Sequence, residues 1–393
     1  MVFRDLLTAT KDGDWGKGEP EPGHMAAHVI RGTDFAEVAR GRIGNVPLRY
    51  LPESTVHRRL LQADDILIET AGGSRERPTG RTVLITQERL DTFPGPVTCA
   101  SFARFLRVNP TVASPRYVYW YLQHLYARGD MWVHQVQHTG VARFQFTRFA
   151  DTVEIPLPPR SEQDAITTVL GALDDKIATN ERIAVTADEL AGAHFRQCPG
   201  RGPRTITEVA SITMGQSPPG ETYNETGEGL PFYQGTKDFG MRYPGHRVWC
   251  TDVSRHAQEN DVLVSVRAPV GEINVAVEEC GIGRGVAAVR SAQYPHVLLH
   301  ALASDPSVWR PFEADGTVFG SINKKQFSQL KLSWPGDQEI EALESQLKAL
   351  DNRVRQTADE SRTLAALRDA LLPQFMSGRL HVRDAEKIVE DHV

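Results

Sequence analysis

Residues 157–197 read LPPRSEQDAITTVLGALDDKIATNERIAVTADELAGAHFRQ, and residues 334–374 read WPGDQEIEALESQLKALDNRVRQTADESRTLAALRDALLPQ. When they are aligned at a constant offset of 177 positions, Leu173-Asp174 matches Leu350-Asp351. In both stretches apolar or small residues recur in steps of three and four, the spacing of a long helix that buries one stripe against another helix. The expected stripe contains Ile166, Leu170, Leu173, Ile177 and Asn180 in the first helix, and Leu343, Leu347, Leu350 and Val354 in the second.

Asn180 is a polar residue within this stripe. A polar residue at such a position commonly fixes the register of two helices at a cost in stability, and we favour this interpretation. The alternative is simple exposure on an Ala-rich stretch. One helix present in two copies, with different sequence before each copy, predicts two different modules that the helices hold apart.

The overall composition is that of a soluble globular protein. A length of 393 residues predicts two or three domains, and the hydrophobic and charged fractions are 40% and 24%. The N-terminal residues lack the apolar segment of a signal peptide, and no apolar run approaches the ~20 residues that span a bilayer. The four cysteines lie far apart without CxxC spacing. We therefore expect a cytoplasmic protein without disulfides and without membrane contact.

Basic residues are concentrated before the first helix. Residues 1–150 contain 19 Lys and Arg against 15 Asp and Glu, whereas residues 151–199 contain 4 against 9. Only Lys11 and Lys17 of those 19 are lysines. Arginine suits bidentate contacts with phosphate and guanine. A coding bias toward GC-rich codons would also replace Lys by Arg, so this excess alone is weak support for nucleic-acid binding.

The segments that precede the two helices share an expected order of elements. A strand–loop–strand pattern is followed by a further strand and a helix with Pro in its first turn. Residues 71–75 are expected to form a loop. The matched pairs are residues 64–68 with 260–264, residues 100–105 with 285–290, and residues 117–125 with 297–303.

Sequence motifs for catalysis are weak throughout the chain. Residues 217–220, SPPG, are similar to the tetrapeptide of amino-methyltransferases, but Gly220 cannot stack on a flipped base as the aromatic fourth residue does. The glycines of residues 281–285, GIGRG, lack a following helix and acidic residue, and they indicate a tight turn near another segment. No Walker A sequence occurs. None of these motifs therefore identifies a catalytic site.

A metal site is also disfavoured. His134 and His138 have the i, i+4 spacing that would place them on one helical face, as in a zinc pair. The residues between them lack the glutamate that zinc proteases use as a base. A structural or surface role is the better interpretation, and no bound metal or cofactor is expected.

Loops rich in Arg, Gln, Asn and Ser remain, and they recur at matching places in the two modules. These residue types contact base edges and phosphates. Each loop alone could be solvated surface, and the recurrence is the stronger indication. The candidate contact residues are Ser74, Arg75, Arg77, Arg81, Arg143 and Gln145 in the first module, and Gln234, Lys237, Arg267, Arg284, Asn323 and Lys324 in the second.

With these features the chain resembles the specificity subunits of type I restriction–modification systems over nearly its whole length. The resemblance rests on EIPLPP at residues 154–159 with Glu162-Gln163, on Leu173-Asp174 with Ile177 and Asn180, on DVLVSVRAPVG at residues 261–271, on Gly283-Arg284-Gly285, and on LPQFMSG at residues 372–378. The second copy departs from the usual PPxxEQ, because residues 335–338 read PGDQ.

The resemblance implies an α+β protein in which two pseudo-repeated target-recognition domains are joined by two long antiparallel helices, similar to a coiled coil. The implied segments are residues 1–156 (first recognition domain), 157–197 (first spacer helix), 198–204 (linker), 205–333 (second recognition domain), 334–380 (second spacer helix) and 381–393 (polar tail). Each recognition domain would read one half of a split, asymmetric DNA target.

The resemblance also implies the partners: double-stranded DNA, two methyltransferase subunits and a restriction–translocase subunit. S-adenosylmethionine, ATP and Mg²⁺ would bind only to those partner subunits, and this chain would be a non-catalytic specificity subunit. Two alternatives remain open. The chain could serve another multi-subunit restriction or phage-defence system, or it could be a DNA-modifying enzyme whose site has no recognisable motif.

Overall fold

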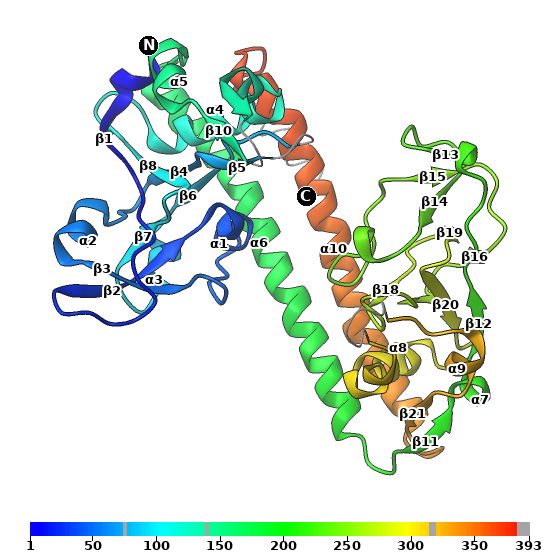
Figure 1. The fold of residues 1–393 in the computed structure, drawn as a ribbon. Coiled ribbons are helices and arrows are strands. Elements are labelled where there is room, and N and C mark those ends of the chain that lie inside the picture. The colour runs from blue at the N-terminus through cyan, green and yellow to red at the C-terminus, as the bar shows by residue number, and fades with distance from the viewer. Residues whose placement is uncertain (74–76, 138–140, 314–319, 383–393) are drawn as a thin grey trace. The chain divides into compact units, whose positions relative to one another are not determined.

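The chain forms two compact units in the computed structural model, which describes residues 1–73, 77–137, 141–313 and 320–382 (Figure 1). Unit 1 comprises Met1–Asn180 and Glu360–Val393, and unit 2 comprises Glu181–Asp359. Both units combine helices with mainly antiparallel sheet, so the predicted α+β fold class is confirmed. Among the described residues, no helix is both long enough and apolar enough to cross a membrane.

Two long helices each supply a segment to both units. They are α6 (Arg160–Gln197) and α10 (Ile340–Met376). α6 begins directly after the prolines, where the Pro159 carbonyl accepts hydrogen bonds from the backbone N–H groups of Glu162 and Gln163 at 2.9 and 3.1 Å. α10 ends shortly before Gly378, whose φ of 68° is the left-handed conformation common at helix C-termini.

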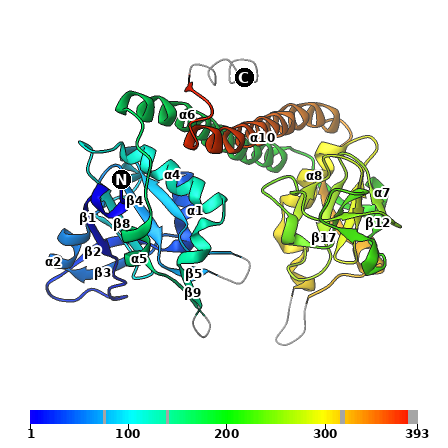
Figure 2. The ribbon, with the colours of Figure 1, turned by 90° about the horizontal axis from the view of Figure 1, so that it is seen from above.

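The helix segments of unit 1 lie side by side and antiparallel (Figures 1 and 2). Arg368 Nη1 of α10 donates to Asp174 Oδ1 of α6 at 2.6 Å. Asn180 Nδ2 donates to Glu360 Oε2 at 2.8 Å. In unit 2 the other segments pack in the same way, through Ala184 and Ala187 against Val354.

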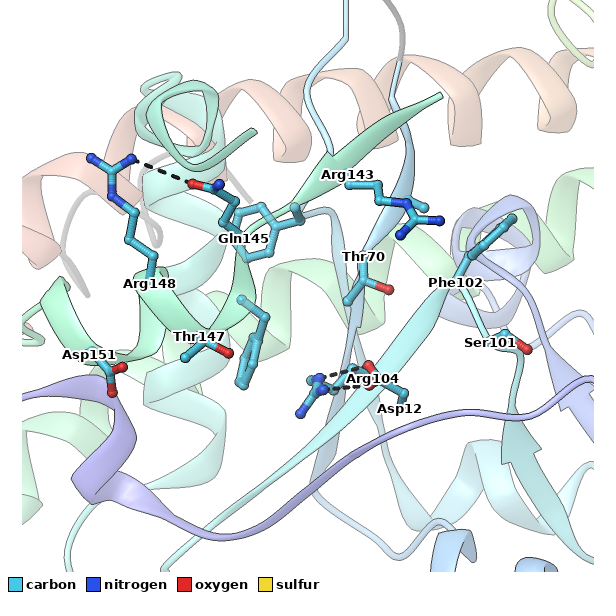
Figure 3. Close-up of a pocket in the computed structure, with 13 residues that line it drawn as sticks. Asp12, Thr70, Ser101, Phe102, Arg104, Arg143, Gln145, Thr147, Arg148 and Asp151 are labelled. Carbon is cyan, nitrogen blue, oxygen red and sulfur yellow. Dashed lines mark hydrogen bonds and ion pairs between the residues drawn. The ribbon is translucent and has the colours of Figure 1, made fainter. Parts of the chain in front are cut away.

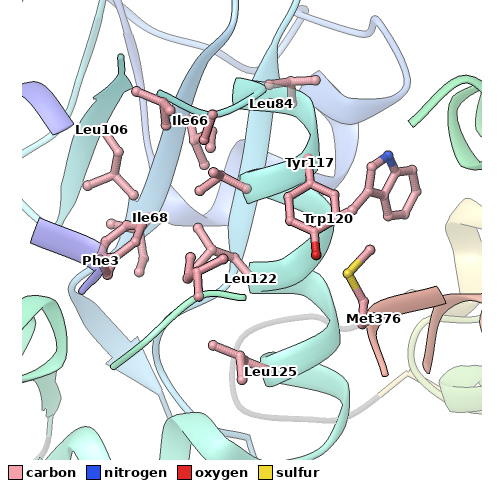
Figure 4. Close-up of a cluster of buried hydrophobic side chains, with 14 of the residues drawn as sticks. Phe3, Ile66, Ile68, Leu84, Leu106, Tyr117, Trp120, Leu122, Leu125 and Met376 are labelled. Atoms are coloured by element: carbon pink, nitrogen blue, oxygen red, sulfur yellow. The ribbon is translucent and has the colours of Figure 1, made fainter. Parts of the chain in front are cut away.

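Unit 1 is built on a four-stranded antiparallel sheet with the order β1-β8-β4-β6. Its main core lies between this sheet and helix α4, where Ile66, Leu106 and Leu122 are fully buried and Met376 of α10 closes one side (Figure 4). Burial of such side chains stabilises the fold by about 1.5–3 kcal/mol each. The elements are β1 (Leu7–Asp12), β8 (Ala103–Val108), β4 (Asp65–Glu69), β6 (Thr82–Ile85) and α4 (Pro115–Ala127).

Two smaller sheets complete unit 1. The first has the order β3-β2-β7 and the second the order β5-β10-β9. Their strands are β3 (Leu48–Pro52), β2 (His24–Ile30), β7 (Val97–Cys99), β5 (Ala71–Gly73), β10 (Ala142–Phe144) and β9 (Gln135–Gln137). The short helices are η1 (Phe3–Leu6), η2 (Gly32–Asp34), α1 (Phe35–Ala39), α2 (Glu53–Arg59), α3 (Gln87–Asp91), η3 (Asp130–His134) and α5 (Phe146–Thr152).

Unit 2 contains a four-stranded antiparallel sheet of the same topology, with the order β12-β20-β17-β18. Helix α8 (Pro295–Ala303) contributes to its core in the place that α4 has in unit 1. The strands of this sheet are β12 (Ser211–Met214), β20 (Val286–Arg290), β17 (Val262–Ser265) and β18 (Ile273–Val275).

The remaining strands of unit 2 form a pair, β11-β21, and a five-stranded sheet with the order β13-β15-β14-β19-β16. These strands are β11 (Gly202–Thr205), β21 (Lys331–Trp334), β13 (Tyr223–Asn224), β15 (Trp249–Cys250), β14 (Leu230–Tyr233), β19 (Cys280–Ile282) and β16 (His256–Ala257). The short helices are α7 (Ile206–Val209), η4 (Gly220–Thr222), η5 (Thr236–Asp238), η6 (Pro306–Val308), η7 (Arg310–Phe312) and α9 (Lys324–Ser328).

Three local predictions are wrong. Residues 71–73 form β5 instead of a loop, because their backbone pairs with β10. His134 ends η3 and residues 135–137 form β9, so no helix carries His134 toward His138, which lies outside the described residues. The match of residues 285–290 with 100–105 is shifted by two positions, because the strand registers align Val286 with Ala103.

Candidate nucleic-acid interface

The two units share one arrangement of strands and hydrogen bonds at matching residues, which we call the frame. Asp65 begins β4 and is buried, and its carboxylate accepts from Arg107 Nε at 2.8 Å and from Arg107 Nη2 at 2.7 Å. Asp261 precedes β17 and accepts in the same way from Arg290 Nε at 2.6 Å and from Arg290 Nη2 at 2.8 Å. The preceding residues, Asp64 and Asn260, have φ of 65° and 68°. The frame that carries the loops is therefore the same in both units.

In unit 1 this frame brings three segments together at one end of the sheet. The Thr70 N–H donates to the Phe102 carbonyl at 2.8 Å, and the Phe144 N–H donates to the Thr70 carbonyl at 2.9 Å. Arg143 pairs with Ala71 in the β10–β5 ladder. We call residues 69–73, 100–104 and 142–148 loop cluster 1.

Unit 2 repeats the same hydrogen bonds with different residues. The Val266 N–H donates to the Gly285 carbonyl at 2.9 Å, and the Ile322 N–H donates to the Val266 carbonyl at 3.0 Å. A β-bridge joins Arg267 to Ser321. We call residues 265–269, 283–286 and 320–324 loop cluster 2. By these bonds Arg143 corresponds to Ser321, Gln145 to Asn323, Ala71 to Arg267 and Ser101 to Arg284.

Loop cluster 1 lines a cavity of about 760 Å³, which we call the arginine cavity (Figure 3). Two predicted residues, Arg143 and Gln145, line it together with Arg104 and Arg148. Arg143 and Arg148 are exposed. Gln145 Oε1 accepts from Arg148 Nη1 at 3.5 Å. An open, arginine-lined hollow is suited to phosphate and base-edge contacts.

The carboxylates of the arginine cavity are engaged by arginines. Arg104 Nε and Nη2 donate to the two carboxylate oxygens of Asp12 at 2.9 and 2.6 Å. Asp151 forms an ion pair with Arg4. The Arg104 guanidinium also lies 4.4 Å from the centroid of the Phe146 ring, which holds it at the cavity wall. The negative charges are thus compensated, and Arg143 and Arg148 leave the cavity with excess positive charge.

The remaining predicted residues of unit 1 have unequal surroundings. Arg77 is exposed, and its Nη2 lies 3.2 Å from the Gly72 carbonyl. Arg81 holds the buried Glu69 through Nε and Nη2, at 2.9 and 2.6 Å, and therefore has a structural role. The hydrogen bond to Glu69 raises the pKa of Arg81, and the negative charge of Glu69 raises it further. Burial of Arg81 lowers this pKa but does not outweigh the two contributions. Ser74 and Arg75 lie outside the described residues.

In unit 2 the glycines on either side of Arg284, Gly283 and Gly285, allow the close approach of Gln234. A Cβ on Gly285 would lie 2.2 Å from the Gln234 carbonyl oxygen, so residue 285 must lack a side chain. This close approach explains Gly283 and Gly285, whereas a Cβ on Gly281 would meet Phe232 and Val253. Arg284 is exposed, and its Nε donates to Ser217 Oγ at 3.1 Å, which gives the SPPG segment a positioning role.

The other predicted residues of unit 2 lie on or near loop cluster 2. Arg267 is exposed next to its bridge partner Ser321. Asn323 caps α9, because its Oδ1 accepts from the Gln326 N–H at 3.0 Å, and Lys324 follows as the first helical residue. Lys237 is exposed in η5, outside the cluster.

The predicted stripe residues of α6 and α10 face the interior of their units. Seven of the nine are buried, and Ile177 and Leu350 are half-buried. Asn180 is 1% exposed and donates to Glu360, while its Oδ1 has no hydrogen-bond partner among the described residues. A buried amide whose oxygen has no hydrogen-bond partner destabilises the fold. The same cost is expected of a polar residue that fixes the register of two helices.

Unit 2 also contains a buried charged network beneath α8. The Asp351 carboxylate can only accept, so His296 Nδ1 and His300 Nε2 donate to it, at 2.8 and 3.1 Å. Arg242 Nη1 adds a contact at 3.4 Å. Burial alone would raise the pKa of Asp351, but the hydrogen bonds and the positive charges outweigh it and hold this pKa well below its usual range.

The sequence prediction missed Arg104, Arg148, Thr70, Ser101 and Phe102, which all line the arginine cavity. Phe102 gave no usable signal, because residues 100–105 were expected to form a strand and the turn at Phe102 appears only in the structure. The others gave none, because only hydrogen bonds between distant segments bring them together.

No protein-family model matches the chain. It is 28% identical over 304 residues, 71% of each chain, to a protein of Methanocaldococcus jannaschii described as "Putative type I restriction enzyme MjaX specificity subunit". It shares its fold with the S subunit of the type I restriction–modification system from M. genitalium, at a TM-score of 0.59, 14% identity and 95% coverage of each chain. The predicted resemblance to type I specificity subunits is thereby confirmed.

Proposed function

We propose that the chain is the DNA-recognition subunit of a type I restriction–modification complex and reads a split, asymmetric target. The observation that carries the proposal is the pair of loop clusters. They occupy the same place in the repeated frame and present different side chains, Arg143 and Gln145 in one and Ser321 and Asn323 in the other. Two clusters with different side chains on one frame are suited to reading two different half-sites.

The M. jannaschii relative supports this proposal, since its name assigns it to a restriction enzyme as a specificity subunit. We further propose that the chain catalyses no reaction itself and docks two methyltransferase subunits and a restriction–translocase subunit in the cytoplasm. S-adenosylmethionine, ATP and Mg²⁺ would then serve those partners.

Replacement of one arginine in each cluster tests the proposal. Arg143→Ala and Arg284→Ala should each weaken binding to the target duplex. If the arginine reads a guanine edge, the loss should be about 1–3 kcal/mol and one target position should relax. If it contacts phosphate, binding should weaken evenly across sequences and the salt slope should fall by about one.

Arg58→Ala is the matched control, because Arg58 is exposed on α2, outside loop cluster 1. The measurement is equilibrium binding to duplexes at several salt concentrations, with the target taken from methylome sequencing. Unchanged affinity and salt slope in both cluster variants would remove the loop clusters from the interface.

A further inference from the structure

A second cavity of unit 1 lies next to the arginine cavity. It has a volume of about 420 Å³, within the range of small-molecule sites, and we call it the aromatic cavity. The two cavities share Ala71, Ser101 and Phe102. A molecule bound at the arginine cavity could therefore extend a group past Phe102 into the aromatic cavity.

Phe102 is exposed, and its ring takes no part in the hydrogen bonds of the frame. Its side chain is 56% exposed in a turn that the Ala103 N–H closes by donating to the Ala100 carbonyl at 2.8 Å. Phe102 contributes its carbonyl to the frame, and in unit 2 the corresponding residue is Gly285. The ring is thus a feature of unit 1 alone, and it is free to contact a ligand.

Trp15 provides a second aromatic ring in the wall of the same cavity. It is 38% exposed, and the Arg49 guanidinium lies 4.5 Å from its ring centroid. Arg49 Nε and Nη2 also donate to the carbonyls of Trp15 and Gly16, at 3.2 and 3.3 Å. These contacts fix the ring before any ligand binds, which lowers the entropic cost of binding.

The lining of the aromatic cavity is mostly apolar, and the carboxylate within it carries no uncompensated charge. Glu69 lines it, and Arg81 compensates its carboxylate. A Cβ at Gly32 or Gly72 would lie 2.9 or 3.0 Å from Glu69 Oε1, so glycine at both positions leaves room for the Glu69 carboxylate. Arg77 also lines the cavity, and its side chain is exposed.

We propose that the aromatic cavity receives one nucleobase, with its faces against Phe102 and Trp15 and its phosphate toward Arg77. This inference rests on the proposed function and deepens it. Every nucleobase has a π-face that stacks on aromatic side chains, and the neighbouring arginine cavity suits the phosphates on either side. The base comes either from a free nucleotide or from DNA that has released it from its stack.

Duplexes with single abasic sites distinguish these two sources. Unpairing a base costs free energy, so removing the partner of the received base should tighten binding of the full chain. We expect one target position at which an abasic partner raises affinity by roughly 10-fold or more. In parallel, calorimetry with each of the four nucleoside monophosphates measures binding of a free base.

Two variants link either signal to the cavity. Phe102→Ala and Trp15→Ala should weaken the binding of the base by roughly 5- to 150-fold, the range that one base–aromatic stack implies. Phe102→Trp should restore it. Trp132→Ala is the control, because Trp132 is 39% exposed, much like Trp15, and does not line the cavity.

Each outcome decides the proposal. An abasic preference or nucleotide binding that depends on Phe102 and Trp15 supports it and identifies the source of the base. Normal duplex binding without either signal overturns it and leaves the proposed function intact. If the wild-type chain binds no duplex, the proposed function fails, and the nucleotide titration alone decides the aromatic cavity.

Discussion

Two aspartates at matching positions of the duplicated helices have pKa values shifted in opposite directions. Asp351 accepts hydrogen bonds from two histidines, and its pKa is lowered despite burial. Burial raises the pKa of Asp174, and the attraction of Arg368 only partly opposes this shift. One residue type at one helix position therefore responds to acid in two ways, because different modules surround it.

The first prediction concerns the pH dependence of unit 2. Because the folded-state pKa of Asp351 is lowered, its contribution to stability is present above the unfolded pKa of about 3.9 and is lost as the pH falls below that value. Asp351→Asn should lack this acid-dependent loss and should be about 3 kcal/mol less stable at neutral pH, because it removes the buried charge that pairs with Arg242 and accepts from His296 and His300.

Urea unfolding of both proteins between pH 3 and about 7 measures the effect. Asp174→Asn is the control, since a raised folded pKa gives the opposite slope. Parallel pH profiles for wild type and Asp351→Asn would show that Asp351 is not the acid-sensitive group.

At the scale of elements, the helix stripes and the repeated strand order could be predicted from the sequence because both are local patterns. Steps of three and four identify a buried helix face, and the matched strands, residues 64–68 and 260–264, have similar sequences. The shift of two positions at residues 285–290 was not predictable, because hydrogen bonds to a distant strand set that register.

The candidate site was predictable only in part, for a related physical reason. The loops around Arg143 and Arg284 were identified by composition, yet their convergence with Thr70 or Val266 depends on long-range backbone hydrogen bonds. The role of Arg81 was not predictable either, because Glu69, its partner, is twelve residues away in sequence and gives no local signal.

The second prediction tests the packing of the helices in unit 2. Leu347 of α10 is fully buried, so Leu347→Ala should destabilise the unit by roughly 2–5 kcal/mol. Leu190 of α6 is 45% exposed, and Leu190→Ala should change stability by no more than about 0.5 kcal/mol. Denaturant unfolding compares the two. Similar losses from both substitutions would contradict the buried stripe.

At the scale of the whole molecule, the long helices belong to both units and link them covalently. The contacts Asn180–Glu360 in unit 1 and His194–Gln346 in unit 2 define one antiparallel register. In that register residues 177–183 of α6 lie opposite residues 357–363 of α10. If the proposed function holds, the length of this region should set the distance between the two half-sites.

The third prediction is that deleting residues 177–183 and 357–363 together shortens the target. Seven helical residues correspond to roughly 10 Å, or about three base pairs of B-DNA. Methylome sequencing of cells that carry the variant should therefore show a spacer about three base pairs shorter, or no methylation if the partners no longer fit. An unchanged spacer would exclude the helices as the determinant of spacing.

The division of the helices also determines the order in which the units can be completed during synthesis. Unit 2 is one continuous stretch, whereas unit 1 takes Leu364, Leu371 and Phe375 into its core from the segment that follows unit 2 in sequence. When the first 180 residues have left the ribosome, the α10 residues that complete their core have not yet been translated. At a synthesis rate of about 5–20 residues per second, these residues follow roughly 10–40 s later. The unit that is begun first is therefore finished last, and its exposed apolar face is a natural target for chaperones in that interval.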